Sequence, residues 1–306
     1  MQKRHKINKQ ELEEKLIPLI QKHSIDNKIF TSSISSLKLF TTNEKSEFQS
    51  IIYEPSICIA VQGSKAVGFG TDMYSYNSSK YLLTCTNVPA NIKIESASKT
   101  KPYVSLVLKF SMEEIYEVMK ELNIQNDKSK KKIQSPFRFN PLDETLLDPV
   151  YRLVKLLDKQ SEIKDFMTPL IKKEIIFLLL QTNEDFLKNY VLEGTLTNQI
   201  VKAISEIKNN YNTLINMTEL SKKIGVSEAS LYQNFKKITT MSPLQYQKKI
   251  RLEEAKFMLA SKDIEASEAA FAVGYESPSQ FSREYSRMFG MSPKAHSELL
   301  KSNQTA

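Results

Sequence analysis

Side chains that can bond to the edges of DNA bases lie in two short stretches near the C-terminal end of the chain. Gln233 lies in the first stretch, and Gln280 and Arg283 lie in the second. Glutamine can form two hydrogen bonds to adenine, and arginine can pair with O6 and N7 of guanine. The chemistry indicated is recognition of double-stranded DNA. A solvated helix face without a ligand is the alternative for each of these residues.

These stretches belong to a pattern that occurs twice. In each copy three apolar or aromatic residues are spaced i, i+4, i+7, which predicts one buried helix stripe. They are Leu231, Phe235 and Ile238 in the first copy, and Phe281, Tyr285 and Met288 in the second. A glycine precedes each set, Gly225 and Gly274, and glycine suits a sharp reversal because it accepts positive φ. The pattern predicts two helix-turn-helix units, at about 218–238 and 266–289, that read adjacent stretches of DNA.

A long helix should separate the two units. Ser242 is its N-cap candidate, and Pro243 follows at the first helical position. Tyr246, Ile250 and Leu259 belong to its apolar faces, which would pack against both units. Such a rigid spacer would hold two recognition helices at a fixed separation, as reading of two successive major-groove segments requires.

Residues for catalysis or metal binding are scarce. The chain has three histidines and two cysteines. No histidine lies between His23 and His296, and none has ligand spacing, so we expect no metal, no cofactor and no enzymatic activity. Cys58 and Cys85 lie in strand-like runs, which favours two buried thiols over a redox-sensing pair.

Composition fits a two-domain globular protein. The chain has 306 residues, 41% of them hydrophobic and 25% charged, and a formal net charge of +8. A basic balance fits nucleic acid but does not establish it. No apolar run is long enough to cross a bilayer and no secretory signal opens the chain, so we expect a cytoplasmic protein with no membrane partner.

The first half of the chain changes from helical to strand-like patterning. Residues 11–23 predict a short amphipathic helix, and period-two patterning follows from about residue 27. The clearest strand-like runs are 57–62, 65–69, 73–76, 80–86, 91–95 and 103–110. Short strands separated by Gly, Asn, Asp and Ser turns predict an antiparallel barrel or sandwich over about 27–110.

Helices should cover about 111–190. Ser111 and Glu114 form a capping box that predicts a helix start. Residues 123–140 are predicted as a loop, in which the run Lys128–Lys132 is a solvated surface. A helix within 142–158 should be interrupted or initiated at Pro149. In a further helix over about 163–190, Leu170, Ile171 and Leu178 are predicted to share an apolar face. That face would meet the protein core or a second subunit.

The ordered motifs of the C-terminal part resemble the DNA-binding domain of AraC-family transcription regulators. The segments that carry the resemblance are Thr218–Ser221, Gly225–Ser227, Phe235–Lys237, Met241–Pro243, Tyr246, Arg251–Lys256, Val273–Tyr275, Ser279–Arg283 and Phe289–Pro293. The N-terminal part is similar to the regulatory domain of one subgroup. Its matching segments are Tyr53–Ser56, Val61–Gly63, Tyr74–Tyr76, Tyr81–Leu83 and Pro169–Ile171.

The resemblance implies an α+β chain with an N-terminal cupin-like antiparallel β-barrel, helices after it, and a C-terminal all-α tandem helix-turn-helix domain. We place the regulatory domain at 1–192 and the DNA-binding domain at 196–306. The residues expected to contact bases are Ala229, Tyr232, Gln233, Ser279, Gln280, Ser282 and Arg283. Those expected to contact phosphates are Ser227, Ser230, Lys236, Lys237 and Arg287. Half-buried packing is the alternative for Tyr232.

The sequence thus predicts a one-component transcription regulator. Expected partners are promoter DNA, a small-molecule effector of unknown identity and a second copy in a homodimer, and RNA polymerase is a candidate. Activation is the expected direction, and the same domain would serve repression. The alternatives are a cupin-type enzyme, or a barrel that only dimerises, each fused to a DNA-binding domain. The missing histidines argue against a metal-dependent enzyme.

Overall fold

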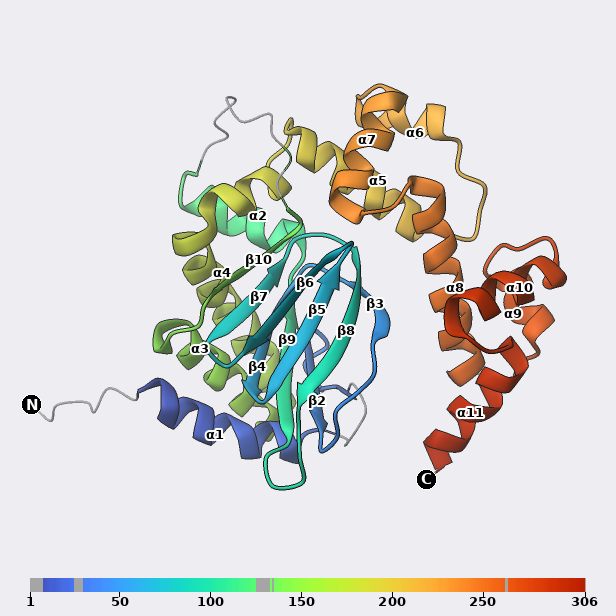
Figure 1. The fold of residues 1–306 in the computed structure, drawn as a ribbon. Coiled ribbons are helices and arrows are strands. Elements are labelled where there is room, and N and C mark those ends of the chain that lie inside the picture. Colours follow the sequence, from blue (N-terminus) through green and yellow to red (C-terminus); the bar gives the residue numbers. More distant parts are fainter. Residues whose placement is uncertain (1–7, 25–29, 125–132, 134, 262–263, 306) are drawn as a thin grey trace, which may run out of the picture. The chain divides into compact units, whose positions relative to one another are not determined.

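The computed structural model describes residues 8–24, 30–124, 133, 135–261 and 264–305, and side chains as far as residue 299. The chain divides into two compact units, Met1–Asn198 and Gln199–Ala306, each described by itself below (Figure 1). The charge run Lys128–Lys132 lies outside the described residues. No helix in the described ranges is long and apolar enough to span a bilayer.

The strands of the first unit form two antiparallel sheets (Figure 1). The strands are β1 (Phe30–Thr31), β2 (Leu37–Thr42), β3 (Gln49–Tyr53), β4 (Ser56–Gln62), β5 (Ser64–Phe69), β6 (Asp72–Asn77), β7 (Lys80–Thr84), β8 (Val88–Ser96), β9 (Tyr103–Lys109) and β10 (Phe137–Pro141). The six-stranded sheet has the order β1-β2-β9-β4-β7-β10, and the four-stranded sheet has the order β3-β8-β5-β6. Antiparallel strands are therefore confirmed. A closed barrel is not formed, because no described strand of one sheet pairs with a strand of the other.

Alternation along the strands sorts side chains between the inside of the sandwich and the helices. In β2 and β9, Phe40 pairs in register with Ser105, and Leu39 pairs with Leu106. Leu39 and Leu106 are fully buried, and α1 (Lys9–Lys22) packs on these strands and on β4. Strand β4 is buried along nearly its whole length, since the opposite sheet covers one face and helices cover the other.

Strand β10 corrects the prediction that residues 123–140 form only a loop. It pairs with β7, with Phe137 opposite Thr84. Phe137 stacks on Phe69 of the other sheet, with ring centroids 3.7 Å apart, and Phe139 contacts Tyr76 at 5.4 Å. Aromatic side chains thus join the two sheets along the β10–β6 side, where backbone hydrogen bonds do not.

Helices on the first unit follow the expected caps but differ in two details. They are α2 (Met112–Glu121), α3 (Glu144–Lys155), a short 3₁₀ turn η1 (Leu156–Asp158) and α4 (Ser161–Val191). The capping box of Ser111 and Glu114 is confirmed. Asp143, not Pro149, begins α3, and Pro149 lies inside a continuous helix in its first two turns. Pro149 removes one N–H but does not interrupt the element.

The predicted apolar face of α4 was also wrong in part. Ile171 is buried, Leu178 is half-buried, and Leu170 is 50% exposed, so the three do not share one face. Residues i and i+1 differ by about 100° around a helix, which separates Leu170 from Ile171. Asn183 has non-helical backbone angles and kinks α4. Its buried amide bonds the Tyr81 hydroxyl at 3.0 Å, which ties the kink to β7.

The second unit is helical throughout its described elements. They are α5 (Leu196–Asn209), which begins at the end of the first unit, α6 (Met217–Ile224), α7 (Glu228–Thr239), α8 (Pro243–Ser261), α9 (Ala266–Ala272), α10 (Pro278–Phe289) and α11 (Pro293–Thr305). Leu252 and Leu259 of α8 lie in one buried cluster with Phe281 and Tyr285 of α10. Phe235 of α7 contacts Tyr246 of α8 edge to face at 5.4 Å. The expected spacer helix is therefore confirmed as part of both cores.

The turn glycines of this unit permit a matched stability test. Gly274 has φ +88°, and a Cβ there would lie 2.1 Å from the Asn212 carbonyl oxygen. Gly290 has a similar φ of +76°, but nothing lies within 4 Å of a Cβ there. We expect Gly290→Ala to cost about 1–2 kcal/mol in unfolding free energy from the backbone alone. Gly274→Ala should cost about 1–3 kcal/mol more, because the clash adds to it. Urea unfolding of the full chain followed by circular dichroism measures both, and equal costs would contradict the close approach at Gly274.

Candidate nucleic-acid interface and ligand cavity

The first helix-turn-helix unit consists of α6 and α7. Gly225 closes α6 with φ +75°. The Ser227 hydroxyl then caps α7 by accepting from the backbone N–H of Ser230 at 3.2 Å. With Leu231 and Phe235 buried, the other side of α7 is left to solvent. The exposed predicted contact residues are Ser227, Ala229, Tyr232, Gln233, Lys236 and Lys237.

Ser230 and Tyr232 are intermediate cases on this helix. Ser230 is half-buried, and its hydroxyl accepts a hydrogen bond from the Asn234 amide at 3.0 Å. Tyr232 is 36% exposed, so its ring lies at the border between packing and solvent. The packing alternative for Tyr232 therefore stays open beside the base-contact prediction.

The second helix-turn-helix unit consists of α9 and α10. The Ser277 hydroxyl caps α10 by accepting from the Gln280 N–H at 3.3 Å, and Pro278 occupies the first turn. Phe281 and Tyr285 face the core. The exposed predicted contact residues are Ser279, Gln280, Arg283 and Arg287, and Ser282 is half-buried. Each unit thus presents one capped helix with a polar outer face, the form in which a recognition helix enters the major groove.

Arg251 on the spacer helix α8 bonds three backbone carbonyls. Its Nε donates to Tyr211 O at 2.6 Å, and its Nη2 donates to Thr213 O at 3.0 Å, both in the segment that leads into α6. Its Nη1 donates to Gly274 O at 2.8 Å, in the turn of the second unit. One guanidinium therefore connects the segment before the first helix-turn-helix unit with the turn of the second helix-turn-helix unit. Charge-assisted hydrogen bonds of this kind are stronger than neutral ones.

Glu284 holds one face of α10 in place. Its carboxylate accepts hydrogen bonds from Lys248 at 2.8 Å, from the Tyr275 hydroxyl at 2.8 Å and from Gln280 at 3.3 Å. Burial alone would raise the pKa of Glu284, but these three donors hold it below its usual value. Gln280, a predicted base contact, therefore has an intramolecular partner that competes for its amide.

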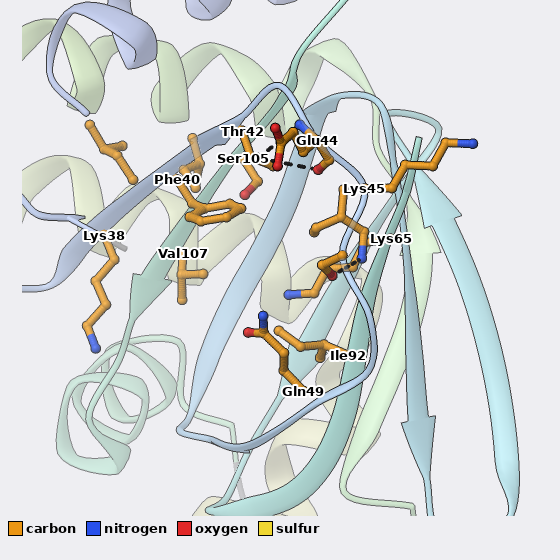
Figure 2. Close-up of a pocket in the computed structure, with 14 residues that line it drawn as sticks. Lys38, Phe40, Thr42, Glu44, Lys45, Gln49, Lys65, Ile92, Ser105 and Val107 are labelled. Atoms are coloured by element: carbon orange, nitrogen blue, oxygen red, sulfur yellow. Dashed lines mark hydrogen bonds between the residues drawn. The ribbon is translucent and has the colours of Figure 1, made fainter. Parts of the chain in front are cut away.

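The N-terminal unit, residues 1–198, contains a cavity of about 320 Å³ between the two sheets (Figure 2). Figure 2 shows Phe40, Ile92 and Val107 around this space, with Ser105 and Lys65 among the polar groups. The cavity lies on the side where β2 and β3 do not pair, opposite the aromatic contacts of β10. Its size and mixed lining are those of a small-molecule site. No described group of three or more His, Cys, Asp or Glu side chains is arranged to hold a metal ion.

Burial shifts the pKa of several ionisable groups in the N-terminal unit. Cys58 and Cys85 are buried and carry free thiols, as predicted, and burial raises the pKa of both. Burial also raises the pKa of Tyr53 and lowers that of Lys65, whose ammonium lies 5.5 Å from the centre of the Tyr53 ring. The thiols are therefore held as neutral groups, which does not favour a redox-sensing role.

Residues 33–185 match the family model of the AraC-type transcriptional regulator N-terminus. The chain belongs to the AraC family. A helix-turn-helix domain model matches residues 220–298, which include α7, α9, α10 and most of α6, the helices of the two helix-turn-helix units. The capped helices and the sheet sandwich thus lie in segments that the family models recognise independently.

Two curated relatives are similar to this AraC-family chain over about half of each sequence. The HTH-type transcriptional activator RhaS of Escherichia fergusonii is 25% identical over 155 residues, which are 50% of this chain and 55% of RhaS. The lactose operon transcription activator of Staphylococcus xylosus is 26% identical over 151 residues, 49% of this chain and 54% of the relative. The chain thus spans about half the length of the curated relatives it matches.

The fold extends over nearly the whole of one solved structure. The crystal structure of unsaturated fatty acid-bound wild-type ToxT from Vibrio cholerae strain SCE256 has a TM-score of 0.57 to this chain. It is 11% identical, and the match covers 85% of this chain and 94% of ToxT. An N-terminal unit of antiparallel sheets with helices and a C-terminal helical unit are therefore a shared architecture.

Sequence reasoning missed the two residues that organise this AraC-type surface. Arg251 belongs to the segment Arg251–Lys256, which carries part of the family resemblance. Nothing in its spacing showed that its partners would be the carbonyls of residues 211, 213 and 274. Glu284 lies four residues after Gln280, a spacing at which helical side chains meet, and that signal could have found their hydrogen bond. The cavity residues, drawn from five strands and one loop, carried no local signal.

Proposed function

We propose that this AraC-family protein is a transcription regulator whose two recognition helices, α7 and α10, bind adjacent major-groove segments of promoter DNA. The observation that carries the proposal is the pair of capped helices with polar outer faces, packed on one spacer helix within one unit. The DNA-binding domain would comprise residues 196–306 and the regulatory domain residues 1–192. The relatives named above are transcription activators, which supports activation over enzymatic work.

Roles for the exposed side chains follow from their chemistry. Arg283 would pair with a guanine, and Gln233 and Gln280 would each bond an adenine. Ala229, Tyr232, Ser279 and Ser282 would complete the base contacts. Ser227 and Ser230 at the start of α7, Lys236 and Lys237 at its end, and Arg287 on α10 would contact phosphates. RNA polymerase would be the further partner of an activator. A protein that binds promoters would act in the cytoplasm, with the chromosome.

The N-terminal unit would be the sensor. Its sheets would form a cupin-like sandwich open on one side, and the cavity there would hold a small effector. A ligand that binds one state of the protein better than another shifts the equilibrium toward that state, so a filled cavity could change DNA binding. The ToxT structure named above holds a fatty acid, which supports a ligand-binding role for this fold.

Homodimerisation would use the exposed stripe of α4. Ile163, Phe166, Leu170 and Phe177 are spaced i, i+3, i+7, i+14, which places them along one side of the helix. Phe166 is 71% exposed, and all four rank among the exposed large hydrophobic residues of the protein. An exposed apolar stripe of this kind marks an interaction surface. A symmetric dimer would bury the same stripe from both copies.

The tandem arrangement can be tested on duplexes selected from a random pool by the full-length protein. Hydroxyl-radical footprinting should show two protected patches on one face of the duplex, about 10–10.5 base pairs apart, for each bound copy. If only one patch per copy is protected, one of the two units does not read DNA. If no duplex is enriched over the starting pool, the proposed function is wrong.

Base and phosphate contacts can be separated with two variants. Arg283→Ala should cost about 1–3 kcal/mol at the selected site and relax the preference at one base pair. Lys236→Ala should weaken binding to all sequences similarly and lower the slope of log K against log salt by about one unit. Fluorescence anisotropy at several salt concentrations measures both. A uniform loss for both variants would remove Arg283 from base reading.

The dimer surface can be tested at adjacent positions of α4. Leu170→Asp should give a folded monomer, because the exposed Asp stays solvated while the apolar interface is lost. Ile171→Asp should unfold the N-terminal unit, because it places a charge in the core of that unit. Met73→Asp, at an exposed methionine of β6, is the control that should remain dimeric. Analytical ultracentrifugation with circular dichroism reads these outcomes, and a folded Leu170→Asp protein that stays dimeric would contradict this interface.

A further inference from the structure

Lys65 occupies a position where strand alternation calls for an apolar residue. In the antiparallel pairing of β5 with β8, Lys65 lies opposite Ile94, and Val67 lies opposite Ile92. Residues i and i+2 of a strand share a face, so Lys65, Val67 and Phe69 point to the same side. Val67 and Phe69 are buried between the sheets. Lys65 thus places an ammonium group on an otherwise apolar inward face.

Lys65 is half-buried, and no described side chain neutralises its ammonium. Among the described residues it forms no ion pair and no hydrogen bond, and its recorded neighbours are the Tyr53 ring and the buried thiol of Cys58. Burial lowers the pKa of Lys65, since the charged form is poorly solvated there. Charged groups inside proteins are normally paired, so an unpaired one beside a cavity indicates a missing counter-charge.

The cavity around Lys65 has the shape of a site for an amphipathic molecule. Phe40, Ile92, Ile94 and Val107 supply apolar walls, and Lys65 supplies the charge. Glu44, the acidic lining residue, is exposed at the rim. The volume of about 320 Å³ lies at the lower end of small-molecule sites, which excludes a polymer as the occupant.

The other two lysines of the lining are placed differently. Lys45 is exposed on the loop between β2 and β3. Lys38 has another interaction within the protein, and Figure 2 shows its side chain at the opposite end of the cavity from Lys65. Lys65 is therefore the lysine best placed to meet a charge inside the cavity.

We propose that this cavity binds a small amphipathic anion, a carboxylate with an apolar body, and that Lys65 pairs with the carboxylate. The inference rests on the proposed ligand-binding role of the N-terminal unit and specifies its ligand class. A bound anion restores the missing counter-charge, and the apolar body displaces water from the walls contributed by both sheets. A neutral molecule of the same shape gains only the second contribution.

The test compares ligands that share an apolar body and differ in head group. Octanoate and naphthoate are the anionic probes, and octanol and octylammonium are the neutral and cationic analogues of octanoate. Isothermal titration calorimetry on the full-length protein measures the affinities. We expect octanoate to bind at least about ten-fold more tightly than octanol, as a charge-assisted hydrogen bond implies. Octylammonium should bind more weakly than octanol.

Two methionine variants assign the effect to one side chain. Lys65→Met removes the charge but keeps an unbranched apolar stem, so it should bind octanol as the wild type does and lose the preference for octanoate. Lys45→Met, the matched change at the exposed rim, should keep that preference. Unchanged octanol binding shows that Lys65→Met is folded, and if it does not fold, the wild-type comparison of octanoate with octanol still decides.

The outcomes separate this inference from the regulator proposal. Equal binding of octanoate and octanol to the wild type, or no binding of either anion, overturns the inference. A preference for octanoate that survives in Lys65→Met also overturns it. Duplex selection with the same protein is the independent readout. If duplexes are enriched but no anion binds, only the ligand assignment is wrong. If an anion binds but no duplex is enriched, only the regulator proposal is wrong.

Discussion

The arrangement of the C-terminal unit depends on the three hydrogen bonds that Arg251 donates to backbone carbonyls. Those carbonyls belong to two loops far apart in sequence, one before α6 and one after α9. Gln247, one turn earlier on α8, donates to two of the same carbonyls, those of Tyr211 and Thr213. Because α8 also contributes to both hydrophobic cores, a shift of this helix would move both recognition helices together. Packing alone would leave the loops free to adjust, whereas directed hydrogen bonds set their position.

In the N-terminal unit the two sheets are joined on one side and separated by a cavity on the other. On the β10–β6 side the rings of Phe137, Phe139, Phe69 and Tyr76 fill the gap. On the β2–β3 side the gap stays open as the cavity. The loop between β2 and β3 is nevertheless held, since Ser46 exchanges two hydrogen bonds with the Ile94 backbone. Rigidity on one side and space on the other come from where the aromatic residues occur in the sequence.

Features with local causes could be predicted from the sequence, and features with distant causes could not. Ser111 and Ser242 cap their helices through neighbours three residues away, so spacing alone predicted them. Strand β10 was missed because only its pairing with β7 and its contacts with Phe69 and Tyr74 make it a strand. Pro149 was misjudged because the cap at Asp143 starts the helix several residues earlier, so the proline removes one backbone hydrogen bond within a helix that its buried apolar face holds in place. The role of Lys65 needed the cross-strand register, which no short stretch of sequence contains.

The gap between the two sheets on the β2–β3 side also affects how quickly the cavity can fill. In a closed barrel, a molecule that enters through the wall must first break backbone hydrogen bonds between strands, which opens slowly and rarely. Here no strand pairing joins the two sheets among the described residues, so entry would require only side-chain rotations around the rim. Exposed side chains rotate on picosecond to nanosecond timescales. Association at this site would then be limited by diffusion and desolvation, and the lifetime of the complex would be set by the contacts inside. A sandwich left open on one side therefore suits a sensor that must follow changes in ligand concentration without unfolding any part of its sheets.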